Sequence, residues 1–129
     1  MHTAFLIGRI LFGGYFLWSG LQHFLRHAMV TEYVAAKHIP APGVAVAVGG
    51  LMLVLGALSI LLGAWPRLGG ALIILFLLIA TPVMHNFWAA NDPSTAMNDM
   101  INFTKNMALV GAALMFYGIP KPWPKSVGR

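Results

Sequence analysis

The chain contains no cysteine and only three acidic residues among its 129. Without cysteine it can form no disulfide, no thiolate metal site and no iron–sulfur cluster, and it can perform no thiol chemistry of its own. Charged residues make up 9% of the sequence, against about a quarter in soluble domains, while apolar residues make up 59%. These deficits exclude an ordinary soluble domain and predict one integral membrane domain over residues 1–129.

Charge is also absent over long stretches. No charged side chain lies between Lys37 and Arg67, or between Arg67 and Asp92. Each stretch exceeds the roughly 20 residues that cross a bilayer core. Because lipid offers no partners to the backbone, such runs form helices. We therefore predict an all-α, membrane-embedded antiparallel four-helix bundle, with spans at about residues 4–24, 44–63, 68–88 and 101–119.

The few charges predict an orientation. With four spans, the termini and the turn at Arg67 share one side, which carries four basic residues and no acid. The opposite side holds three basic residues and all three acids. The positive-inside rule then places both termini in the cytoplasm. The basic residues are scattered, so the net charge of +5 does not indicate nucleic-acid binding.

Glycines recur at intervals of seven residues in three of the predicted spans. Small residues at this spacing form stripes that let helices approach closely. We therefore expect these glycines to lie at helix contacts: Gly13, Gly20, Gly49, Gly56, Gly63, Gly111 and Gly118.

Polar residues inside the spans carry the functional information, because each costs free energy in lipid. In an antiparallel bundle the end of the first span, the end of the third and the start of the fourth lie at one membrane surface. We expect one polar cluster there, near the outer surface. With Arg9 added from the first span, the candidate ligand-binding residues are Arg9, His23, His85, Asn86, Trp88, Asn102, Lys105 and Asn106.

Arg9 and Lys105 each allow two interpretations. Either side chain can extend along apolar neighbours to the membrane interface. Alternatively it points into the bundle, where Arg9 would need backbone carbonyls, water or an external partner such as a quinone head group or a lipid phosphate. Lys105 would then meet asparagine carbonyls and a ligand oxygen near His85.

The histidines also allow more than one interpretation. Within the cluster only His23 and His27 have the i, i+4 spacing of metal ligands, so we expect neither a metal site nor haem. Histidines beside Phe24, Phe87 and Trp88 are typical of a membrane interface. They also suit a pocket that handles protons or binds a head group, since imidazole titrates near neutral pH.

Several short motifs, taken in order, resemble the DoxX family of small four-helix membrane proteins. The first span has Gly8-Arg9 followed by Gly13-Gly14 and Ser19-Gly20. Further matches are Glu32-Tyr33, the segment 38–42, Gly49-Gly50-Leu51 with Leu55-Gly56, the segment His85-Asn86-Phe87-Trp88 and the segment 102–106. The family's recurrent arginine, histidine and lysine-asparagine positions correspond here to Arg9, His85, Lys105 and Asn106.

The resemblance implies a link to redox chemistry, because the family includes subunits associated with thiosulfate:quinone oxidoreduction. We expect an accessory or subunit in quinone-linked redox in the inner membrane of a bacterium, with a polar pocket inside the membrane and a redox partner protein. The sequence assigns no catalytic residue, and any redox activity would be that of an oxidoreductase-associated subunit acting with a partner or a bound quinone. Many relatives carry a glutamate where this chain has Ala47 and Val48, which weakens a proton relay. The alternative is a non-catalytic membrane scaffold, assembly or cargo-handling protein.

Overall fold

A computed structural model describes residues 2–127, which are helical with short connections. The α-helices are α1 (His2–Leu25), α2 (His27–Ala35), α3 (Pro42–Leu62), α4 (Pro66–Met84) and α5 (Pro93–Met115), and two short 3-10 helices are η1 (Phe87–Ala89) and η2 (Phe116–Gly118). The residues over His2–Leu25, Pro42–Leu62 and Pro66–Ala89 are long and apolar enough to cross a membrane. The all-α fold is therefore confirmed, with three candidate spans, while the fourth span stays a prediction.

Proline and glycine set most helix boundaries. α3, α4 and α5 each begin with proline at a first-turn position, where the missing N–H costs no hydrogen bond. α3 ends at Leu62, and Gly63, which caps it, has a left-handed φ of 69° that suits glycine. The carboxylate of Asp92 accepts from the Thr95 amide at 3.0 Å and caps α5. α5 thus begins at Pro93, before the predicted span at 101–119.

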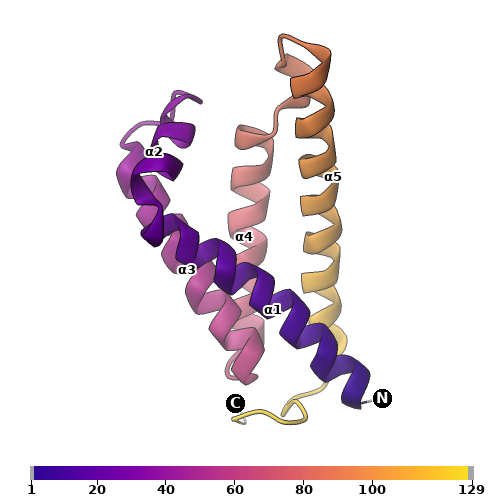
Figure 1. Cartoon of the computed structure of the whole chain (residues 1–129). Helices are drawn as coiled ribbons and strands as arrows, with labels where there is room; N and C mark the ends of the chain where they lie inside the picture. Colours follow the sequence, from indigo (N-terminus) through magenta and orange to yellow (C-terminus); the bar gives the residue numbers. More distant parts are fainter. Residues whose placement is uncertain (1, 128–129) are drawn as a thin grey trace.

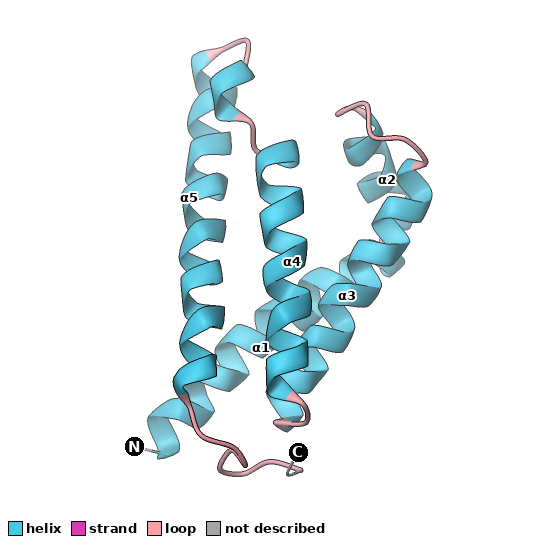
Figure 2. Cartoon of the chain, turned by 180° about the vertical axis from the view of Figure 1, so that it is seen from behind, coloured by secondary structure: helices cyan, strands magenta, loops and turns pink. Residues whose placement is uncertain are grey.

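The long helices pack in sequence order, α1 on α3, α3 on α4 and α4 on α5 (Figure 1). Both termini lie at the same end of the molecule, and α1 crosses α3 and α4 obliquely. The core joins all four of these helices and the C-terminal segment through Phe12, Phe16, Leu53, Ala57, Ile60, Ile73, Leu77, Ala113 and Trp123. Seen from behind, α4 stands between α5 and α3, and α3 leans away from α4 toward the end that carries α2 (Figure 2).

Glycines bring the first three long helices together. A Cβ on Gly20 would lie 2.9 Å from the backbone nitrogen of Val54, and one on Gly56 would lie 2.9 Å from the carbonyl oxygen of Gly69. These positions are therefore helix contacts, as the spacing predicts. Gly111 and Gly118 differ, because nothing lies within 4 Å of a Cβ added there.

The connection between the first two predicted spans contains a helix, because residues 27–35 form α2. The helix begins where the backbone turns at Arg26, and none of its residues is fully buried. His27 Nε2 lies 3.1 Å from the carbonyl oxygen of Gly43, which ties α2 to the start of α3. Lys37 donates to Asn86 Oδ1 at 2.9 Å, which ties the end of α2 to the connection after α4.

Candidate functional site

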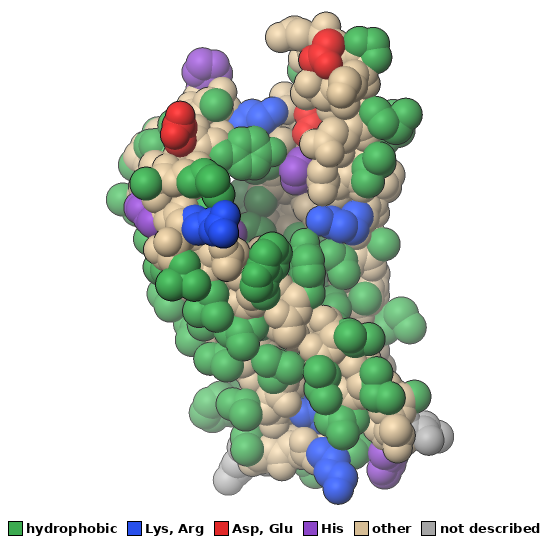
Figure 3. Space-filling model, in the orientation of Figure 1, with side chains coloured by type: hydrophobic (Ala, Val, Ile, Leu, Met, Phe, Trp, Pro, Cys, Tyr) green, Lys and Arg blue, Asp and Glu red, His purple; other side chains and the backbone are tan. Residues whose placement is uncertain are grey.

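A cleft of about 560 Å³ lies between two groups of helices, with α1, α2 and α3 on one side and α4 and α5 on the other. It begins beside Tyr15 and Phe16, in the middle of α1, and extends toward the end of the molecule that carries α2. The space-filling view shows this hollow, with basic side chains and a histidine around its rim (Figure 3). Its volume is within the roughly 300–1,000 Å³ of small-molecule sites.

Lys105 bridges the cleft from α5 toward α1. Its Nζ donates to the hydroxyl oxygen of Tyr15 at 3.1 Å and to Asn102 Oδ1 at 3.4 Å. Because Tyr15 accepts from the ammonium, its own hydroxyl hydrogen remains available to another acceptor. Asn106, one position after Lys105, also lines the cleft, and its amide nitrogen donates to Thr81 Oγ1 at 3.1 Å.

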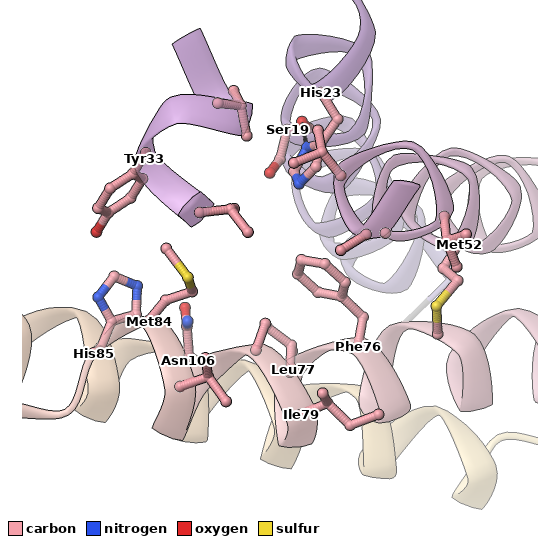
Figure 4. A pocket seen from close by; sticks show the side chains of 18 of the residues that line it. Ser19, His23, Tyr33, Met52, Phe76, Leu77, Ile79, Met84, His85 and Asn106 are labelled. Carbon is pink, nitrogen blue, oxygen red and sulfur yellow. Dashed lines mark hydrogen bonds between the residues drawn. The ribbon is translucent and has the colours of Figure 1, made fainter. Parts of the chain in front are cut away.

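His85 and Asp99 form a polar pair at the wider end of the cleft. Nδ1 of His85 lies 3.4 Å from Oδ1 of Asp99, whose side chain is 6% exposed. A carboxylate only accepts, so this contact places the Nδ1 hydrogen toward Asp99 and turns Nε2 into an acceptor when the ring is neutral. Tyr33 of α2 lies opposite His85 (Figure 4). Partial burial, and then the charge of Asp99, raises the pKa of Tyr33, so its hydroxyl stays protonated and can donate.

His23 has the same tautomer for a similar reason. Its Nδ1 lies 2.8 Å from the carbonyl oxygen of Ser19, one turn earlier in α1. Since a carbonyl only accepts, Nδ1 carries the hydrogen and Nε2 is the acceptor of the neutral ring. The ring lies edge-on to Phe76, at 5.9 Å between centroids, which places it at the apolar wall of the cleft.

Four of the predicted ligand-binding residues therefore line one cleft, namely His23, His85, Lys105 and Asn106. Three others lie near it without lining it. Asn86 accepts a hydrogen bond from Lys37. Asn102 accepts one from Lys105 and donates one to the Asn98 carbonyl. Trp88 is 62% exposed, and its ring packs against Phe87 and Phe103. The polar cluster at the cleft therefore contains fewer of the predicted residues than the sequence indicates.

Arg9 lies at the opposite end of the bundle, away from the cleft. Its side chain is 1% exposed and points into the protein. The guanidinium donates to the carbonyls of Ile60, Leu61, Pro124 and Lys125 and lies over the rings of Phe5 and Trp123. These contacts hold the C-terminal segment against α1 and α3.

Sequence reasoning missed Asp99, Tyr15 and Tyr33. A signal for Asp99 is present, because Asp99 and Asn106 are seven residues apart and share a face of α5. It was overlooked because the fourth helix was expected to begin near residue 101. Tyr15 and Tyr33 carry no pattern that separates them from ordinary interfacial tyrosines.

Comparison with known proteins agrees with the fold. The family model that matches the chain is DoxX, over residues 4–86, which covers α1 to α4 and ends before Lys105 and Asn106. A curated relative is the inner membrane protein YphA of Escherichia coli (strain K12), 30% identical over 110 residues, or 85% of this chain and 78% of the relative. No solved structure matches. The apolar helices and this relative support a location in a bacterial inner membrane, and the chain belongs to the DoxX family.

Proposed function

We propose that the chain is an accessory protein of quinone-linked redox in the inner membrane, and that its cleft binds a quinone-like head group. One observation carries the proposal. Hydrogen-bonding side chains from α1, α5 and the residue that follows α4 converge on an otherwise apolar cleft between helices. An apolar cleft with a few placed polar groups is typical of sites for small amphipathic ligands.

The polar groups of the cleft fit both the oxidised and the reduced form of a quinone head group. The ammonium of Lys105 and the hydroxyl of Tyr15 are donors, which a quinone carbonyl requires. The Nε2 atoms of His23 and His85 are acceptors, which the hydroxyl of the reduced form requires. The cleft therefore offers donors from Lys105 and Tyr15 and acceptors from the two histidines.

The role of this chain's residues is to bind and orient the head group. Nε2 of His85 can accept a hydrogen bond from it, because Nδ1 of the neutral ring points its hydrogen toward Asp99. Apolar walls exclude water from the bound head group and strengthen the hydrogen bonds to it. A bound quinone supplies the redox chemistry and a partner protein supplies the electrons, since the cysteine-free chain has no redox side-chain set.

We also propose that α5 completes an antiparallel four-helix bundle across the membrane, with both termini in the cytoplasm. The basic excess beside the termini supports this orientation. The polar first half of α5 would then lie near the outer surface, where Lys105 and Asn106 line the cleft. The cleft would accordingly lie in the outer half of the bilayer.

A binding titration tests the proposed ligand class. The purified protein in lipid nanodiscs is titrated with decylubiquinone, beside the variants Lys105→Met and Lys121→Met. A hydrogen bond from a charged donor is worth about 1.5–3 kcal/mol, so Lys105→Met should weaken binding about tenfold or more. Lys121 is an exposed lysine away from the cleft, and its replacement should leave affinity within about twofold. Equal affinities in all three proteins would contradict the proposal.

A further inference from the structure

The helices that line the cleft differ in the chemistry of the side chains they contribute. Most polar groups come from α1, α5 and the residue that follows α4, namely Tyr15, Ser19, His23, Lys105, Asn106 and His85, and Tyr33 of α2 adds one more. All lining residues of α3 and of α4 itself are apolar, from Ala45 to Met52 and from Phe76 to Met84. A bound molecule therefore places its polar end beside α1 and α5 and its apolar part against α3 and α4.

The apolar side opens toward lipid. Val48 of α3 is 52% exposed, and Ile79 and Val83 of α4 are 59% and 40% exposed, yet all three line the cleft. A residue that both lines a cleft and faces outward marks its mouth. The cleft also reaches the surface at Tyr15 and Lys105, which are both exposed, but the hydrogen bond between them spans it there.

The packing of α3 against α4 explains why this mouth exists. At Gly56 the backbones nearly touch, because an added Cβ would lie 2.9 Å from the carbonyl oxygen of Gly69. Two turns toward the start of α3, at Gly49, the nearest neighbour on α4 is the edge of the Phe76 ring and not the backbone. Beyond that point the two helices separate (Figure 2). In the close view, Met52 lies at the far end of the cleft from Tyr33 and His85 (Figure 4).

We infer that the cleft takes a single-chain amphiphile with a hydrogen-bond-accepting carbonyl head, and that its chain passes between α3 and α4 into the bilayer. The inference rests on the proposed function and adds the route of the chain. A cleft of about 560 Å³ holds a head group and the start of a chain. The remainder of a membrane-length chain must leave, and the apolar mouth at Val48, Ile79 and Val83 is lined for it.

A substitution at the mouth separates the chain from the head group. Ile79→Trp fills the mouth, while Leu78→Trp places the same bulk on the neighbouring exposed position, which does not line the cleft. The probes are decylubiquinone and the chainless ubiquinone-0, titrated in nanodiscs. Ile79→Trp should weaken the binding of decylubiquinone about tenfold and that of ubiquinone-0 less than twofold. Leu78→Trp should change neither affinity. Equal effects of Ile79→Trp on both probes, or none on either, would overturn the chain route.

A second measurement uses the unaltered protein, so it does not depend on how a variant folds. Decylubiquinone with a diazirine at the end of its chain is photolysed in the complex, and the labelled peptides are identified by mass spectrometry. Label should appear at Val48, Ile79 or Val83. Label at Tyr15 and on α5 would overturn the route while leaving the proposed function intact. Failure of both quinones to bind the wild-type protein would instead overturn the proposed function, and the inference with it.

Discussion

The guanidinium of Arg9 is the most completely buried charge in the described part of the chain, and it donates hydrogen bonds to backbone carbonyls. Two belong to the last turn of α3, at Ile60 and Leu61, and two to the C-terminal segment, at Pro124 and Lys125. Carbonyls at a helix C-terminus lack intrahelical partners and carry partial negative charge. Arg9 therefore joins three parts of the chain by neutralising orphan carbonyls, which explains how a charge is tolerated there.

Replacing Arg9 should release the C-terminal segment. Arg9→Met keeps much of the apolar stem but leaves these carbonyls without their donor, at a cost of about 3 kcal/mol or more of unfolding free energy. Denaturation in mixed detergent micelles measures this loss. Limited trypsin digestion should show faster cleavage after Lys125, which the segment carries. Unchanged stability and cleavage would mean that the contacts of Arg9 are not what holds the segment.

Asp92 gives a pH dependence at the start of α5. Hydrogen bonds from the Thr95 side chain, and then from its amide, hold the pKa of Asp92 below its ordinary value. A lowered folded-state pKa means that the cap stabilises the helix fully above the ordinary value and is lost as the pH falls through the lowered one. The Thr95 amide should therefore lose its protection against hydrogen exchange below about pH 3.8. Asp92→Asn keeps an oxygen acceptor and should show no such pH dependence.

Helix contacts show where periodicity is a sufficient guide and where it is not. Seven-residue glycine spacing predicted contacts in α1, α3 and α5, yet Gly111 faces open space while Gly56 meets the backbone of Gly69. A repeat identifies a stripe but not what covers it. Inside the described residues, the stripe of α5 has no neighbour within this chain.

This difference predicts opposite effects of one substitution. Gly56→Ala places a methyl 2.7 Å from Cγ1 of Ile73 and 2.9 Å from a backbone oxygen, so α3 and α4 must move apart at a cost of about 1–3 kcal/mol. Gly111→Ala meets nothing and should be neutral or stabilise α5 by up to about 1 kcal/mol. Unfolding of both variants in the same micelles measures the difference. Equal destabilisation would contradict the packing of α3 on α4.

The apolar runs were enough to predict the helices now seen as α1, α3 and α4, because length and hydropathy define a span. α2 was missed because its sequence, HAMVTEYVA, mixes polar and apolar residues and has no side-chain cap. The early start of α5 was missed because the predicted span at 101–119 took no account of the cap at Asp92 and the proline after it. The antiparallel order of the helices was enough to predict that His85 and Lys105 lie at the same end of the bundle. The contact of Arg9 with Pro124 could not be predicted in this way, because it depends on tertiary packing.

The whole molecule is predicted to cross the membrane four times, and the absence of cysteine makes this directly testable. Single cysteines at Asn91 and Val127 introduce unique labelling sites in an otherwise thiol-free chain. In intact cells with a permeable outer membrane, an impermeant maleimide should label Asn91→Cys at once, and Val127→Cys only after the inner membrane is disrupted. Immediate labelling of both positions would mean that α5 does not cross the bilayer.

The central claim is that the cleft holds a lipid-soluble molecule with a carbonyl head group. The most direct test is to purify the protein in mild detergent from its native membrane, extract the bound lipids and identify them by mass spectrometry, for the wild type and for Lys105→Met. The account predicts a quinone enriched well above its level in the membrane and largely lost from Lys105→Met. Two identical lipid profiles, each matching the bulk membrane, would contradict it.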